Sequence, residues 1–146
     1  MKTRHSRIRP ARRWKRRAFV LIVAAAVVGV AWILAPPFER QPPRPPGSEL
    51  VEIKGTMGGF STAEIRVRAG RPLTVRLVSV DTPFHTDGGG KHQFAIDALG
   101  VNIIAPPQGA REASFTPPPG VYEYYCDVCC GGRVNPTMRG KLIVEA

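Results

Sequence analysis

The sequence predicts an all-β domain, a Greek-key β-sandwich, behind one hydrophobic N-terminal helix. Three observations carry this prediction. Six segments after residue 48 alternate apolar with polar residues and are rich in Val, Ile, Leu and aromatic side chains. Gly, Pro, Asn and Asp separate these segments, and helical periodicity is absent between them. The 146 residues leave room for one domain after the N-terminal region, and two packed sheets are the usual way to bury such strands.

The predicted strands are short and evenly spaced. In chain order they are LVEIK (50–54), EIRVR (64–68), LTVRLVSV (73–80), HQFAID (92–97), VYEYYC (121–126) and KLIVE (141–145).

Most of the excess positive charge lies at the N-terminus. Residues 1–17 carry nine of the 21 Lys and Arg residues and no acidic residue. The other twelve basic residues are nearly balanced by the eleven acidic ones, although the whole chain has a net charge of +10. The folded part therefore offers no basic stripe to a phosphate backbone, and we expect no nucleic-acid binding.

The run AFVLIVAAAVVGVAWILA (18–35) follows this basic tail and contains no charged residue over eighteen positions. As a helix it would be about 27 Å long, close to the hydrocarbon thickness of a bilayer. The basic side favours a cytoplasmic N-terminus. We therefore expect 1–17 to be a cytoplasmic tail, 18–35 to be a single-pass membrane anchor, and the rest to lie on the periplasmic or external face.

A cleaved signal peptide is the alternative interpretation of the same run, because a basic segment before an apolar one is typical of both. The segment KRRAFVL also resembles a twin-arginine export signal. Pro36 directly follows Ala35, where a cleavage site would be expected, and this favours the uncleaved anchor. Either interpretation exports the remainder of the chain.

The segment PPFERQPPRPPG (36–47) is too rich in proline for a helix or a central strand. It is typical of a semi-rigid linker. The folded domain is accordingly predicted at 48–146.

All three cysteines lie near the end of the chain, at Cys126, Cys129 and Cys130. In an exported domain, one disulfide and one spare thiol would be the simplest interpretation. However, a bridge from Cys126 to either of the others would close a very small loop, and neighbouring cysteines seldom pair. A thiol centre therefore stays open as an alternative to a disulfide.

Two loops combine soft donors with an imidazole. One is TPFHTDGGGKHQFAIDALGVN, before and within a strand, and the other is YYCDVCCGGRVNPTMRGKLIV, between the last two strands. In a Greek-key sandwich, such loops can meet at one end. Thiolate, thioether and imidazole donors together favour copper over other metals.

The sequence resembles the cupredoxins, and among them the dinuclear copper (CuA-type) domain of cytochrome oxidase subunit II and nitrous oxide reductase. HQFAIDALGVN is similar to the family segment that begins with a histidine ligand. GVYEYYC followed by CGG resembles its C-x-x-x-C pair of bridging cysteines, and PTMRGKLIV resembles its methionine ligand and closing strand. The resemblance covers about 56–145 and implies the cupredoxin fold with His92, Cys126, Cys130 and Met138 as copper ligands.

The second histidine of the family pattern is missing. Val134 stands at its usual spacing, and Met138 lies one residue further from Cys130 than in the familiar motif. His85, Cys129 or Asn135 could supply the replacement donor. An imidazole would suit an electron-transfer centre, whereas a third sulfur would suit Cu(I).

These features predict an electron-transfer protein that holds one or two copper ions and works with a redox partner or a respiratory oxidase. A chaperone that delivers Cu(I) to an oxidase and a metal-free thiol or disulfide sandwich are the alternatives. The sequence lacks a hydrolytic triad, a phosphate-binding loop and paired catalytic carboxylates, so we do not expect an enzyme.

Overall fold

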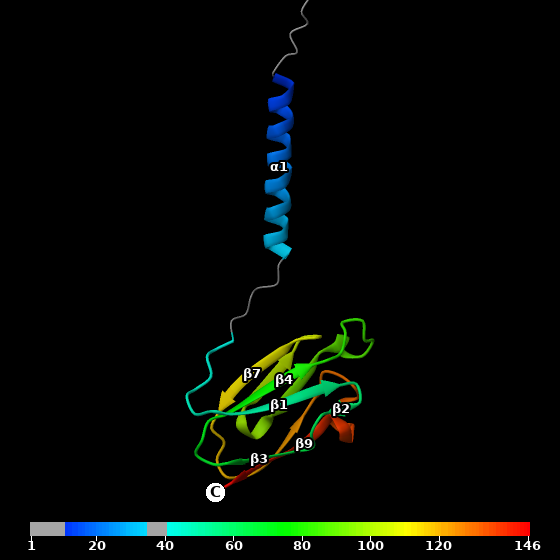
Figure 1. The fold of residues 1–146 in the computed structure, drawn as a ribbon. Coiled ribbons are helices and arrows are strands. Elements are labelled where there is room, and N and C mark those ends of the chain that lie inside the picture. The colour runs from blue at the N-terminus through cyan, green and yellow to red at the C-terminus, as the bar shows by residue number, and fades with distance from the viewer. Residues whose placement is uncertain (1–10, 35–40) are drawn as a thin grey trace, which may run out of the picture. The chain divides into compact units, whose positions relative to one another are not determined.

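The C-terminal unit, Gln41–Ala146, is a sandwich of two β-sheets (Figure 1). The structure, a computed structural model, describes residues 11–34 and 41–146. The predicted β-sandwich is confirmed. The compact unit begins seven residues before the predicted domain boundary, because part of the proline-rich segment contacts the sheets.

One sheet has four strands and the other has five. Across the first sheet the order is β2 (Gly59–Phe60), β1 (Glu49–Thr56), β4 (Leu73–Ser79) and β7 (Ala110–Phe115). Across the second it is β3 (Glu64–Arg68), β9 (Arg139–Glu145), β8 (Gly120–Tyr125), β5 (His92–Ile96) and β6 (Val101–Ala105). The pairs β1–β4 and β3–β9 are parallel, and the other pairs are antiparallel.

All six predicted strands are present, and the structure adds three that the sequence analysis missed. β2 is only two residues long. β6 alternates buried and exposed residues, but its sequence VNIIA has two adjacent isoleucines that obscure the pattern. β7 has the sequence AREASF, and it joins its sheet through backbone pairing with β4 although its side chains show little alternation.

Tyr124 on β8 lies at the centre of the packing between the sheets. Its ring stacks on Phe94 with centroids 4.8 Å apart and meets the edge of Phe60 at 5.4 Å. Its hydroxyl donates to the carbonyl of Thr62 at 2.6 Å, which satisfies the buried polar group. Burial raises the pKa of Tyr124 to about 12, so the phenol stays protonated and remains a donor.

Gly140 on β9 leaves room for this ring. A Cβ at position 140 would lie 2.3 Å from Tyr124 Cζ and 2.6 Å from the carbonyl oxygen of Ala63. We therefore expect Gly140→Ala to lower the free energy of unfolding by about 1–3 kcal/mol, as overpacking of a buried site does. Urea unfolding measures the loss, with Lys141→Ala at the adjacent exposed position as the control. An unchanged midpoint for Gly140→Ala would contradict this packing.

The helix α1 (Ala11–Leu34) includes most of the predicted membrane segment, whose last residue lies outside the described residues. It also includes the charged residues Lys15, Arg16 and Arg17. In the part of the chain that the structure describes, no helix is both long enough and apolar enough to cross a membrane. The membrane anchor at 18–35 stays a prediction.

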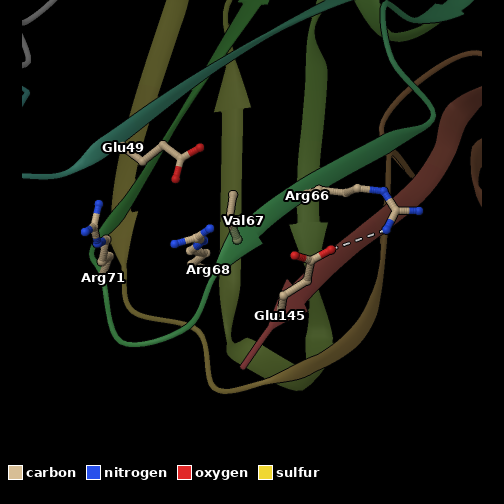
Figure 2. Close-up of a pocket in the computed structure, with 6 residues that line it drawn as sticks. All are labelled: Glu49, Arg66, Val67, Arg68, Arg71 and Glu145. Atoms are coloured by element: carbon tan, nitrogen blue, oxygen red, sulfur yellow. Dashed lines mark hydrogen bonds and ion pairs between the residues drawn. The ribbon is translucent and has the colours of Figure 1, made fainter.

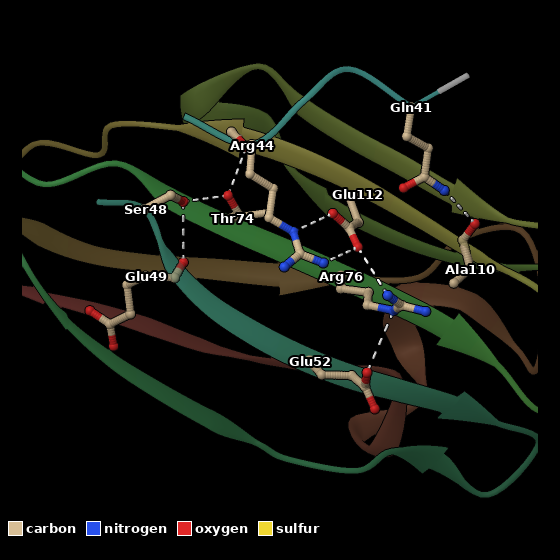
Figure 3. Close-up of polar contacts among 10 residues, drawn as sticks. Gln41, Arg44, Ser48, Glu49, Glu52, Thr74, Arg76, Ala110 and Glu112 are labelled. Carbon is tan, nitrogen blue, oxygen red and sulfur yellow. Dashed lines mark hydrogen bonds and ion pairs between the residues drawn. The ribbon is translucent and has the colours of Figure 1, made fainter. Parts of the chain in front are cut away.

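The described part of the proline-rich segment is attached to the first sheet (Figure 3). Arg44 makes two hydrogen bonds of 2.8 Å to the carboxylate of Glu112 on β7, and Gln41 donates to the carbonyl of Ala110. Arg76 on β4 approaches the same carboxylate at 3.2 Å. Residues 41–47 therefore follow the surface of the domain, whereas the composition predicted a semi-rigid linker apart from it.

The sandwich end where β3 and β9 finish has an open pocket of about 360 Å³ (Figure 2). Its lining residues are Glu49, Arg66, Val67, Arg68, Arg71 and Glu145. Arg66 and Glu145 are 3.5 Å apart and form an ion pair. The pocket lies away from the cysteines, which are at the opposite ends of these strands.

Candidate metal centre

The predicted donor residues gather at the end of the sandwich where β1, β4 and β8 finish. Two loops form this end, 80–91 between β4 and β5, and 126–138 between β8 and β9 (Figure 1). Asp87 links them, since its carboxylate accepts a hydrogen bond of 2.5 Å from the backbone N–H of Cys130. The two loops therefore meet in space, as the sequence analysis expected.

His92 is the first residue of β5, and its side chain is 0% exposed. Its Nε2 lies 2.8 Å from Asp81 Oδ2, and its Nδ1 lies 3.2 Å from Cys129 Sγ. Burial lowers the pKa of His92, but hydrogen bonds to Cys126 and Asp81 outweigh this effect and raise the pKa overall. Nδ1 is thus the nitrogen that faces the sulfur atoms.

Cys126 and Cys129 form a close pair of thiols, with their Sγ atoms 3.1 Å apart. Both are buried, and both are free thiols in this structure. The hydrogen bond from Cys129 lowers the pKa of Cys126 to about 4, helped by His92 and by the backbone N–H groups of Gln93 and Val128. The same bond raises the pKa of Cys129, which makes Cys126 the more acidic thiol of the pair.

Cys130 lies at the edge of this cluster and is half-buried. Its φ of 58° places it in the left-handed region, which turns the chain immediately after Cys129. Its sulfur, Cys129 Sγ and a ring nitrogen of His92 lie within 4.8 Å of one another. Burial raises the pKa of Cys130. The predicted C-x-x-x-C partner is therefore near the site, but Cys129 lies closer to its centre.

Met138 completes the cluster from the other end of the loop. It is 0% exposed and packs with Cys126 and Cys129 in a small group that Phe60 and Val128 cover. The N–H of Cys126 donates to the carbonyl of Met138 at 2.9 Å, which fixes the two ends of the ligand loop side by side.

The other candidate donors point elsewhere. His85 lies across Asp81 from the thiols, with its Nε2 3.6 Å from Asp81 Oδ1. The amide oxygen of Asn135 accepts from the N–H and the hydroxyl of Thr137, and its nitrogen donates to the carbonyl of Cys130. Val134, at the spacing of the family's second histidine, is 88% exposed. Of the three alternative donors, the structure brings only Cys129 into the cluster.

Asp81 and Gly55 belong to the site although the sequence analysis did not single them out. Asp81 forms a hydrogen bond with Nε2 of His92, the ring nitrogen that does not face Cys129. Gly55 on β1 lies against the imidazole, and a Cβ there would be 2.5 Å from His92 Cγ. The acidic residue in VDTPFH was a usable signal, because ligating histidines usually donate their second N–H to a carboxylate or carbonyl. No comparable signal marked Gly55.

A family model described as a cupredoxin-like domain matches residues 22–144. The chain belongs to this family. No curated protein sequence matches this cupredoxin-like chain.

Solved structures support the same fold. A heme-copper terminal oxidase dimer contains a chain that is 21% identical, with a TM-score of 0.52 and coverage of 94% of this chain and 100% of that one. The Cu(I)-bound metal-binding domain of the Cu(I)-exporting P-type ATPase CopA of Streptococcus pneumoniae is 17% identical, with a TM-score of 0.53 and coverage of 73% and 94%. The periplasmic domain of cytochrome oxidase subunit II of Bradyrhizobium japonicum is 19% identical, with a TM-score of 0.51 and coverage of 68% and 86%.

The donor set of this cupredoxin-like domain is chemically suited to a soft metal ion. The Sγ atoms of Cys126 and Cys129 lie 3.1 Å apart, and Cys129 Sγ lies 3.2 Å from Nδ1 of His92. A metal ion binds nitrogen at about 2.0 Å and sulfur at about 2.3 Å, so two donors bound to the same ion lie slightly further apart than these donors do. A small opening of the cluster would therefore admit an ion.

Proposed function

We propose that this domain binds copper through His92, Cys126, Cys129 and Met138 and acts as an electron carrier. The observation that carries the proposal is the burial of Cys126, Cys129 and Met138 in one cluster, with the buried His92 3.2 Å from Cys129 Sγ. The donors are an imidazole, two thiols and a thioether, the set that favours copper. Cys130 is the nearest further donor, and its position allows for a second ion.

Burial favours the transfer of electrons over the transfer of ions. Electrons tunnel through a few layers of protein, whereas an ion leaves only by exchanging ligands with an acceptor that reaches it. The ends of the ligand loop are also tied together, by the hydrogen bond from the Cys126 N–H to Met138. A site held in this way changes little in geometry between Cu(I) and Cu(II), which keeps the reorganisation on electron transfer small.

A second function, the delivery of Cu(I), is favoured by a different observation. The cluster contains a single imidazole, and one of its three thiols, Cys130, is partly accessible. Sulfur-rich sites prefer Cu(I), and an accessible thiol is the atom through which an incoming or outgoing ion would exchange. This second function keeps the same ligands but needs no Cu(II) state.

Neither function requires catalysis, so we propose a carrier or binding protein and not an enzyme. The folds of a periplasmic oxidase domain and of a terminal oxidase chain support a place outside the cytoplasmic membrane and a respiratory oxidase as the partner. Binding of purified oxidase to the copper-loaded protein, compared with the metal-free protein, tests the partner.

Spectroscopy on the full-length chain distinguishes the two functions. The protein is reduced, loaded with copper under anaerobic conditions and then oxidised. An electron carrier is expected to give intense sulfur-to-copper absorption and a reversible electron paramagnetic resonance signal, mononuclear or mixed-valence dinuclear. A protein that binds Cu(I) but stays colourless on oxidation would favour delivery. Failure to bind copper, together with a Cys126 disulfide in mass spectrometry, would reject both.

The position of Val134 leads to a prediction about the missing histidine. We expect Val134→His to leave the number of imidazoles bound to copper at one, because this side chain points into solvent. Pulsed electron paramagnetic resonance of the Cu(II) form counts coordinated nitrogens, with Val134→Gln as the matched control. A second nitrogen in the histidine variant would show that the ligand loop rearranges on loading.

A further inference from the structure

The loop 80–91 carries a nearly buried carboxylate against the candidate ligand His92. The side chain of Asp81 is 12% exposed. Its backbone carbonyl accepts a hydrogen bond of 3.0 Å from the N–H of Gln108. At the base of the loop, the hydroxyl of Ser79 donates to the carbonyl of Gly90 at 2.6 Å. These contacts hold Asp81 in place at the start of the loop.

The two oxygens of Asp81 face two different histidines. Oδ2 lies 2.8 Å from Nε2 of His92, and Oδ1 lies 3.6 Å from Nε2 of His85. His92 is fully buried, whereas the side chain of His85 is 32% exposed. The carboxylate therefore connects the buried imidazole to a second imidazole at the surface.

This arrangement selects which nitrogen of His92 can bind a metal. A carboxylate only accepts hydrogen bonds, so Asp81 places a proton on Nε2. In the neutral ring, Nδ1 then keeps its lone pair, and Nδ1 is the atom that faces Cys129. Gly55 closes the other side of the ring, where even a methyl group would collide with Cγ.

We propose that Asp81 and His85 form a positioning pair that fixes the tautomer and orientation of His92 for metal binding. The proposal rests on the proposed function, in which His92 binds copper. In this pair, His85 is not a metal ligand but helps to hold the carboxylate of Asp81. Asp81 acts through His92 and has no contact with the ion itself.

The tautomer of His92 in the metal-free protein tests the pair directly. The ring ¹⁵N shifts of the full-length chain are recorded at alkaline pH, where the imidazole is neutral. In the wild type we expect a protonated Nε2 and an unprotonated Nδ1. In Asp81→Ala the sulfur of Cys129 is the remaining acceptor beside the ring, so the proton should move toward Nδ1. Asp81→Asn preserves the size of the side chain and should weaken the preference without leaving a cavity.

Asp87→Ala is the matched control, because Asp87 lies in the same loop but contacts the N–H of Cys130 and not His92. It should leave the ring shifts of His92 unchanged. An unaltered tautomer in both Asp81 variants would overturn the proposal. So would an equal change in Asp87→Ala, since this would indicate a general effect of the loop.

Copper affinity gives the second readout, by competition with a chromophoric Cu(I) chelator. Loss of the partner of a ligating histidine usually costs about 10–100-fold in metal affinity, and we expect this loss for Asp81→Ala. His85→Ala should lower the affinity less and leave the Cu(II) spectrum unchanged. A loss of one coordinated nitrogen in His85→Ala would make His85 a ligand and would contradict its assigned role.

The two proposals fail in different ways. If the wild type binds no copper, the proposed function fails, while the ring shifts still report on the pair. If the wild type binds copper and the Asp81 variants match it in both affinity and tautomer, the pair fails and the proposed function stands.

Discussion

Cys126→Ser is expected to abolish tight copper binding and the sulfur-to-copper absorption. Cys126 contacts Cys129, packs against Met138 and accepts from the Gln93 N–H, so it is the most embedded of the three sulfurs. A hydroxyl is a poor ligand for Cu(I). The affinity should fall by more than about 100-fold, because loss of an outer partner alone costs about 10–100-fold. Chelator competition and visible spectroscopy measure both effects.

Cys129→Ser and Cys130→Ser provide a matched comparison at adjacent positions. Cys129 is buried between Cys126 and His92, so its loss should resemble the loss of Cys126. Cys130 lies at the edge, and its serine variant should keep most of the affinity for the first copper ion. The reverse order, with Cys130 essential and Cys129 dispensable, would establish the C-x-x-x-C pair of the family pattern and refute the assignment to Cys129.

Gly55→Ala is expected to impair both folding stability and metal binding. The added Cβ would lie 2.5 Å from Cγ and 3.0 Å from Nδ1 of His92, and the buried ring has no free space to enter. Overpacking of this kind costs about 1–3 kcal/mol in the free energy of unfolding. Displacement of Nδ1 should also lower Cu(I) affinity. Urea unfolding of the metal-free protein and chelator competition separate the two effects.

Gly58→Ala is the control for this substitution, since it lies in the adjacent turn. Its Cβ would meet only the side-chain oxygen of Thr56, at an ordinary distance of 3.5 Å. It should leave stability and copper affinity close to those of the wild type. If Gly55→Ala behaved in the same way, His92 would have to move freely, and the fixed orientation of its ring would be wrong.

The fold was predictable wherever side-chain alternation reflects one buried face. KLIVE and EIRVR alternate clearly, and they form the neighbouring strands β9 and β3, each with one buried face. β7 escaped prediction because its place in the sheet depends on backbone pairing with β4, which leaves little trace in its side chains. The attachment of residues 41–47 was missed for a similar reason, since Arg44 finds its partner Glu112 only after the strands have assembled.

The residue types of the candidate site could be predicted from the sequence, but their arrangement in space could not. His92, Cys126 and Met138 could be selected because their spacing resembles that of a known family and because their donors share one chemistry. The resemblance selected Cys130 and left Cys129 as a possible replacement donor, because the directions of adjacent side chains depend on the local backbone and cannot be read from the sequence. The positive φ of Cys130 turns the chain after Cys129, which lies buried between Cys126 and His92.

The amino-acid pattern alone predicted a β-sandwich and two loops with sulfur and imidazole donors, and it showed that position 134 is not a histidine. Which donors meet depends on the three-dimensional fold, because the relevant contacts join residues far apart in the chain. Asp81 meets His92 only after loop 80–91 folds back, and Gly55 reaches the same ring from another strand. In the proposed site, Cys129 takes the place of the missing histidine, and the turn at Cys130 follows it directly.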